Sequence, residues 1–285
     1  MGMKASNAIA TFFKYLVLIL VGLIMIYPLL WMVSATFKDN SEIFAGIGLW
    51  IKNPTLEGYK NALNNFGGSI NILQAMLNTY SYVIPKVICT VVSACIAAYG
   101  FGRFDFPGRK ILFSIMLATL FLPQVVLNVP QFLLYTKFGW VNSPFYLAIW
   151  VHTAFATETY FVYQLVQFMR NVPRDLDEAA AIDGCSSFQT LYKVIVPMLG
   201  PALVSCALFQ FMWSCNDFMG PLLYVSTPGK YPMSLFVKLS MDGDTGFAWN
   251  KILALSLISI LPQLIVFFCA QDQFVEGISA GAVKG

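Results

Sequence analysis

The sequence predicts an all-helical integral membrane protein with six transmembrane helices. Of its 285 residues, 58% are hydrophobic and only 11% are charged, and the mean hydropathy is +0.70. An ordinary soluble domain carries about 25% charged residues. A water-soluble fold of this size could not bury so much apolar surface, so we expect lipid to cover part of it.

Runs of residues without charge define the spans. The first run, residues 15–37, is 23 residues long, which is about 35 Å as a helix and enough to cross about 30 Å of hydrocarbon. Three of the runs are interrupted, by Lys86, by His152 and Glu158, and by Asp217. The predicted spans, which form one domain over residues 1–285, are about 15–37, 72–99, 111–136, 144–169, 201–224 and 252–271.

An even number of spans places both termini on the same side of the membrane. We expect this side to be cytoplasmic, because all four arginines of the chain then lie on the cytoplasmic side. The external loops are then residues 38–71 and 226–250. The cytoplasmic segments are residues 100–110, residues 170–200 between spans four and five, and a tail from residue 272, which is rich in small residues and predicted to be flexible. The four arginines are Arg103, Arg109, Arg170 and Arg174.

The segment 170–200 is longer and more patterned than a connection between spans requires. Pro173 suits the first turn of a helix, and Gly184 is a natural left-handed stop. Ser186 with Gln189 then predicts a capping box that opens a second short helix, which closes near Pro197. The sequence therefore predicts a helix–Gly–helix loop at the membrane surface.

Leu176, Ala179 and Ala180 share one face of the first of these helices at i, i+3, i+4 spacing. Alanines on such a face let another surface approach closely. The alternative is an amphipathic hairpin that only anchors spans four and five, and the residue pattern alone does not decide between the two.

The same segment resembles the Glu-Ala-Ala loop of ABC importer permeases. The match comprises Glu178-Ala179-Ala180, then Gly184, then Val194-x-Val196-Pro197. The family pattern ends in Ile-x-Leu-Pro, so valine at both aliphatic positions is a conservative departure. Further stretches resemble the carbohydrate-uptake branch of this family, similar to the smaller permease of maltose transporters: residues 98–110, Asn216-Asp217-Phe218, and the ending, residues 275–285.

The resemblance implies a permease subunit of an ATP-driven, binding-protein-dependent importer in the bacterial cytoplasmic membrane. Its substrate would be a carbohydrate, an oligosaccharide, carried by alternating access. The implied partners are a second homologous permease, two ATPase subunits that bind ATP and magnesium, and an extracytoplasmic solute-binding protein. Within carbohydrate-type permeases, glycerol-3-phosphate or another small polar solute is the alternative substrate.

The resemblance also implies roles for three groups of residues. The coupling residues, which would dock onto an ATPase, are Glu178, Ala179, Ala180, Asp183 and Gly184. The tail residues that would also contact the ATPases are Gly281, Ala282, Val283, Lys284 and Gly285. The tip of the second external loop resembles in position a loop that contacts the binding protein, although a plain solvent loop is the alternative; its residues are Asp242, Gly243, Asp244, Thr245 and Gly246.

Ionisable residues at membrane depth are costly and usually face a cavity or a partner. Asp217, next to Asn216, is the candidate for the translocation path or its gate; the alternative is a buried hydrogen-bonded pair that holds span five to a neighbour. His152 and Glu158 are six residues apart, about 120° from sharing a helix face, so no relay is expected between them. Lys86 either snorkels to the interface or pairs with an acid on another span.

The sequence gives no support for an enzyme, a metalloprotein or a nucleic-acid-binding protein. It has one histidine, His152, and none of the G-x-S-x-G, H-E-x-x-H or Walker A patterns. Its six cysteines show no C-x-x-C pairing, and its formal charge of +3 is too small to indicate nucleic acid. The alternatives from other classes are an ion-coupled secondary transporter that uses Glu158 or Asp217, and a membrane anchor without transport activity.

Overall fold

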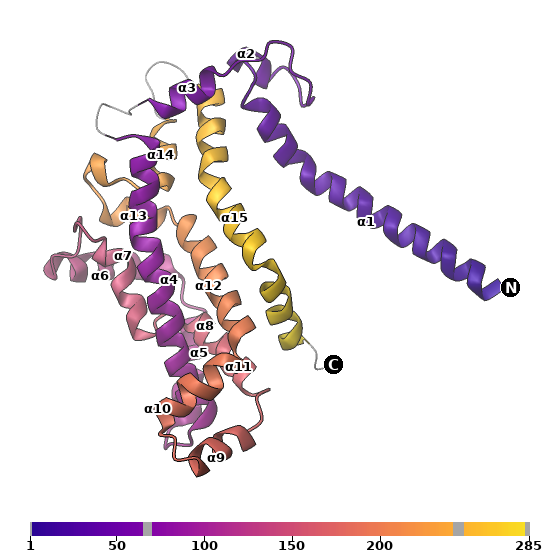
Figure 1. The fold of residues 1–285 in the computed structure, drawn as a ribbon. Helices are drawn as coiled ribbons and strands as arrows, with labels where there is room; N and C mark the ends of the chain where they lie inside the picture. The colour runs from indigo at the N-terminus through magenta and orange to yellow at the C-terminus, as the bar shows by residue number, and fades with distance from the viewer. Residues whose placement is uncertain (1, 65–69, 242–247, 283–285) are drawn as a thin grey trace. The chain divides into compact units, whose positions relative to one another are not determined.

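The computed structural model describes residues 2–64, 70–241 and 248–282, and the chain divides into two compact units. The first unit contains Met1–Ile72 and Val237–Ile260, and the second contains Leu73–Phe236 and Leu261–Gly285. The regular elements of the described ranges are helices (Figure 1).

The first unit contains the long helix α1 (Gly2–Ala35), the short helices α2 (Asn40–Ile43) and α3 (Glu57–Leu63), and the first turns of α15 (Trp249–Ala282). Along α1 nearly every large apolar side chain is exposed, from Phe12 to Val33. A helix that is apolar all round and uncovered by its own chain is suited to lipid or to another membrane protein.

The described segment that follows α1, residues 38–64, is folded rather than an open connection. The Glu42 carboxylate accepts a hydrogen bond of 2.8 Å from the backbone N–H of Lys52, and this bond lowers the pKa of Glu42. The Lys38 ammonium donates to the Gly48 carbonyl at 2.6 Å. The loop therefore has a defined internal structure held by its own charged side chains.

The second unit is built around α4 (Ile72–Arg103), which passes two apolar clusters. Toward its start, Tyr82 and Val83 belong to one cluster; toward its end, Ala94 and Ala98 belong to the other. In the second cluster the small residues of α4 meet α8 (Thr159–Met169) and α12 (Gly200–Cys215), and small residues allow close packing of helices in a membrane.

Apart from the part of α15 that begins at Leu261, the remaining elements of the second unit are short. They are α5 (Arg109–Thr119), α6 (Gln124–Lys137), α7 (Leu147–Trp150), the 3-10 helix η1 (Val151–Phe155), α9 (Asp175–Ile182), α10 (Ser187–Thr190), the π-helical segment η2 (Leu191–Ile195), α11 (Val196–Met198), α13 (Met219–Tyr224) and the 3-10 helix η3 (Pro228–Lys230). Helix α14 (Met233–Leu239) begins in the second unit and ends in the first.

Three of the predicted spans are single helices long and apolar enough to cross a membrane. They cover Ala10–Ala35, Ile72–Arg103 and Trp249–Val275 within the described ranges. These correspond to the predicted spans 15–37, 72–99 and 252–271. The count of crossings rises to five if each of two bent helix pairs crosses as one, so six crossings and cytoplasmic termini stay predictions.

The other three predicted spans are not continuous helices. Residues 111–136 form α5 and α6, bent by 98° at a break that contains Pro123, whose ring removes a backbone donor. Residues 144–169 form α7, η1 and α8, interrupted where Ala156 adopts φ +55°. Residues 201–224 form α12 and α13, with a break at Asn216–Phe218. Apolar composition alone does not reveal these breaks.

The prediction of a flexible tail from residue 272 is wrong for the described residues. Helix α15 continues without interruption to Ala282. The tail is rich in small residues, but no proline lies in it, and glycine in a helix costs only about 1 kcal/mol relative to alanine. Of the predicted tail contacts, Gly281 and Ala282 end this helix, and Val283, Lys284 and Gly285 lie outside the described residues.

Gly58 provides a test of packing in the first unit. A Cβ at this position would lie 2.7 Å from the carbonyl oxygen of Asn250, so Gly58→Ala must displace backbone. We expect the purified protein to lose about 1–3 kcal/mol of stability, as for overpacking in a core, read as a lower thermal unfolding midpoint by tryptophan fluorescence. Gly48→Ala is the control, because nothing lies within 4 Å of its Cβ; equal midpoints for the two variants would contradict the packing.

Candidate functional site

The helix–Gly–helix loop has the local geometry that its residues predict. Gly184 ends α9 at φ +82°, while the N–H of Gly184 donates to Ala181 and that of Cys185 donates to Ala180, the Schellman pattern of a helix stop. Ser186 and Gln189 form the predicted capping box at the start of α10. Helical structure then continues past Pro197 to Met198 and bends by 81° into α12.

The buried residues of α9 are not all of those predicted to share one face, Leu176, Ala179 and Ala180. Ala180 is buried and Leu176 is partly buried against the cluster of α4, α8 and α12. Ala179, predicted on the same face, is exposed. Ala179 therefore belongs to the outward face, which also carries the predicted coupling residues Glu178, Asp183 and Gly184 and the apolar Ile182, 87% exposed.

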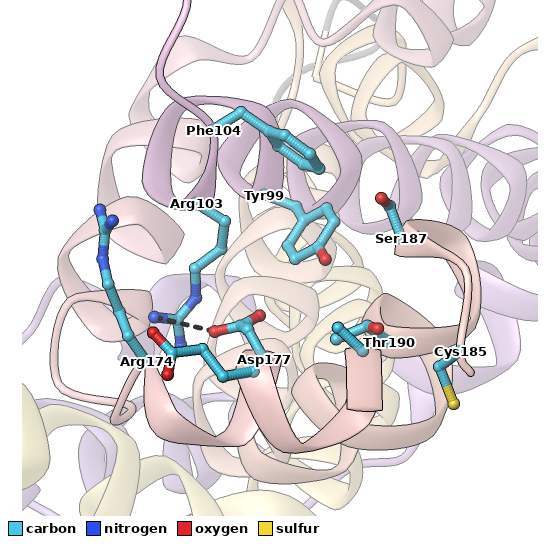
Figure 2. A pocket seen from close by; sticks show the side chains of 10 residues that line it. Tyr99, Arg103, Phe104, Arg174, Asp177, Cys185, Ser187 and Thr190 are labelled. Atoms are coloured by element: carbon cyan, nitrogen blue, oxygen red, sulfur yellow. Dashed lines mark ion pairs between the residues drawn. The ribbon is translucent and has the colours of Figure 1, made fainter. Parts of the chain in front are cut away.

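An ion pair that the sequence did not indicate joins α9 to α4. Arg103, at the end of α4, lies 3.3 Å from Asp177, and the side chain of Arg103 is only 6% exposed. Arg103 also donates to the carbonyl of Val172 at 3.0 Å. Figure 2 shows Arg103 and Tyr99 extending from α4 toward Asp177, beside a cavity of about 250 Å³. Arg103 and Asp177 lie 74 positions apart, so no local pattern in the sequence indicates that they pair.

A larger cavity, of about 690 Å³, lies within the second unit. Its lining includes residues from all three places where predicted spans are broken: Leu120 and Leu122 between α5 and α6, Glu158 before α8, and Asp217 between α12 and α13. Lipid offers backbone groups no hydrogen-bond partner, so irregular backbone at membrane depth is tolerated only inside protein or beside a cavity. The breaks in these helices are therefore tolerated because they border the cavity.

The structure separates the two residues predicted for the translocation path. Asp217 lines the cavity, accepts a hydrogen bond from the N–H of Gly220 at 2.9 Å, and lies 4.0 Å from Lys86. Asn216 instead donates to Gln263 on α15 at 3.1 Å. Asn216 thus takes the role of holding span five to a neighbour, and Asp217 faces the cavity together with Lys86.

His152 and Glu158 also line this cavity, and their side chains lie 4.0 Å apart. The expectation that they point about 120° apart is wrong, because it assumed one continuous helix. The left-handed Ala156 ends η1 before α8 begins, and this reversal brings the two side chains together.

The predicted contacts with a binding protein, Asp242 to Gly246, lie outside the described residues. In the part of the chain that the structure describes, no group of three or more His, Cys, Asp or Glu side chains could hold a metal ion.

Comparison with known proteins places this geometry in a family. The model of the binding-protein-dependent transport system inner membrane component matches residues 90–276. The trehalose/maltose transport system permease protein MalG of Thermococcus litoralis is 31% identical over 267 residues, 94% of each chain. The alpha-glucoside transport system permease protein AglG of Rhizobium meliloti is 33% identical over 236 residues, which are 81% of this chain and 60% of AglG.

A solved structure supports the fold. It is a bacterial ABC transporter involved in the import of the acidic polysaccharide alginate, and one of its chains superposes with a TM-score of 0.78 over 94% of this chain and 98% of that chain, at 19% identity. This likeness concerns the fold alone. With the match over residues 90–276, the chain belongs to the family of binding-protein-dependent transport system inner membrane components.

Proposed function

We propose that this chain is one permease subunit of an ATP-driven importer for a carbohydrate, an oligosaccharide, that works by alternating access. It would pair with a second homologous permease, two ATPase subunits that bind ATP and magnesium, and an extracytoplasmic solute-binding protein. Family membership and the sugar substrates named for MalG and AglG support this proposal.

The observation that carries the proposal is the outward face of α9. This face is small and polar around Glu178 and Ala179, carries one exposed apolar side chain, Ile182, and ends at the left-handed Gly184. Its inward face packs against the core through Leu176 and Ala180. A helix of this kind can dock on an ATPase and move as one body with the permease.

The ion pair between Arg103 and Asp177 would transmit a movement of α9 to α4, which extends into the membrane. Two nearly buried charges offset their desolvation only when they stay paired, so α9 and the end of α4 are held together. ATP-driven closure of the ATPases would then displace α9, and α4 would follow.

Substitutions in the loop test its coupling role. Gly184→Pro and Glu178→Lys should reduce uptake to background in proteoliposomes that contain the complete importer, while the protein still inserts and assembles. Proline cannot adopt the positive φ of Gly184, and lysine reverses the charge of the docking face.

The matched control is Gly139→Pro, since Gly139 also has a positive φ, +69°, but lies outside the loop. If Gly139→Pro assembles, its uptake should exceed that of Gly184→Pro. Uptake of the Gly184 and Glu178 variants at the wild-type rate would rule out a coupling role for the loop.

Substitutions of Arg103 and Asp177 test the ion pair. Asp177→Asn leaves the Arg103 charge without its partner, so we expect a loss of about 3–5 kcal/mol, the range for breaking a buried pair. The measurements are the thermal midpoint and the ATPase activity that a loaded binding protein stimulates. The double variant Arg103→Gln/Asp177→Asn should recover part of the stability, because no unpaired charge remains.

Arg174→Gln serves as the control for the pair, because Arg174 lines the same cavity but is exposed. We expect it to behave like the wild type. The variants Arg103→Gln and Asp177→Asn are also measured singly. If their losses of stability simply add in the double variant, Arg103 and Asp177 do not interact.

A further inference from the structure

We propose that the cavity of about 690 Å³ binds part of the transported sugar in this subunit, and that it selects sugars without a net negative charge. This inference rests on the proposed import function and adds a site and a substrate class to it. The volume lies within the range of about 300–1,000 Å³ that is typical of small-molecule sites.

The charged groups of the cavity do not satisfy one another. Lys86 and Asp217 are 4.0 Å apart, as are His152 and Glu158, which is longer than a hydrogen bond. Among the described residues, neither the Lys86 ammonium nor the Glu158 carboxylate makes a hydrogen bond. A purely structural ion pair in this setting would need close geometry to offset its desolvation. The donors of lysine and the acceptors of the carboxylates are therefore left for hydroxyl groups, which can serve both.

Helix α6 adds a stripe of amides to the same cavity. Gln124, Asn128 and Gln131 all line it, and their i, i+4, i+7 spacing places them on one helix face. None of the three amides hydrogen-bonds another side chain or backbone group in the described ranges. On the opposite face, Val126 and Val129 are 66% and 69% exposed. Amides donate and accept together, as sugar hydroxyls do.

Aromatic side chains complete the lining. Tyr135, Tyr160, Trp213 and Tyr224 face the cavity from α6, α8, α12 and α13. They supply apolar surfaces for the carbon-bound hydrogens of a pyranose ring, while the amides and charged groups take its hydroxyls. Broken membrane helices around a central cavity are also where transporters commonly hold their substrates.

The charge of the lining restricts the sugar. With histidine neutral, Lys86 contributes one positive charge, and Glu158 and Asp217 contribute two negative charges. A uronic acid would lose its hydration and meet a net negative lining, and both effects oppose binding. A neutral oligosaccharide meets neither cost.

Cysteine protection tests this site in the assembled importer. Asn128→Cys places a thiol in the cavity, and Val129→Cys places one on the opposite face of α6. Labelling by a small methanethiosulfonate reagent is followed at each position by mass spectrometry, which separates these thiols from the native cysteines. The probes are four neutral sugars (maltose, trehalose, lactose and diacetylchitobiose) and one acidic sugar, trigalacturonate.

At least one neutral sugar should slow labelling at position 128, by about tenfold at ten times its dissociation constant, following 1 + [L]/Kd. The same sugar should leave position 129 unchanged, and trigalacturonate should protect neither. In Glu158→Gln the lining loses one negative charge, and trigalacturonate should begin to protect position 128. Asp105→Asn is the control, because Asp105 is an exposed acid outside the cavity. In this variant trigalacturonate should still not protect position 128.

Uptake of the same sugars in proteoliposomes tests the import function separately from the proposed binding site. If one neutral sugar is transported but protects neither position, or protects both equally, the cavity is not its binding site and the import function stands. Protection of position 128 by trigalacturonate in the wild type would overturn the charge selection. If the importer transports none of the neutral sugars, the proposed function fails first.

Discussion

The lack of hydrogen-bond partners in lipid is the constraint on which the second unit depends. Each predicted span that is broken exposes backbone groups, and these need protein or a polar cavity beside them. The breaks before α6, before α8 and before α13 all border the cavity of about 690 Å³. A single polar region therefore compensates for three interruptions, and its lining collects the charged residues that the spans carry.

Helix α4 connects this polar region to the surface loop. Lys86 faces the cavity next to Pro85, which lies inside the helix, and Arg103 holds α9 at the helix end. From Lys86 to Arg103 the helix rises about 26 Å. Because a continuous helix is stiff, a displacement of α9 would be felt at the cavity without a chain of separate contacts. The small residues Ala94 and Ala98, packed against α8, lie between the two ends.

Much of the architecture followed from local sequence signals. The long helices α1, α4 and α15 were predicted because each is an extended apolar run with few charges. The stop at Gly184 and the capping box of Ser186 were predicted because both depend on residues within a few positions of one another.

Several features that the sequence did not reveal involve distant contacts or unusual backbone. Nothing near Ala156 marks its positive φ, so the approach of His152 to Glu158 could not be foreseen. The pairs Lys86–Asp217 and Arg103–Asp177 join residues far apart in the chain. Asp217 was identified as a candidate because a charge in an apolar run is costly, but its partner and its cavity required the fold.

Photo-crosslinking at Ile182 tests most directly whether α9 is the docking element for an ATPase. A benzophenone amino acid replaces Ile182, which is 87% exposed on α9, and a second replaces Trp50, 85% exposed between α2 and α3, as the control. In native membranes, position 182 should crosslink to an ATPase subunit in an ATP-dependent manner, and position 50 should not. Crosslinks from position 182 to lipid alone would contradict the proposed docking.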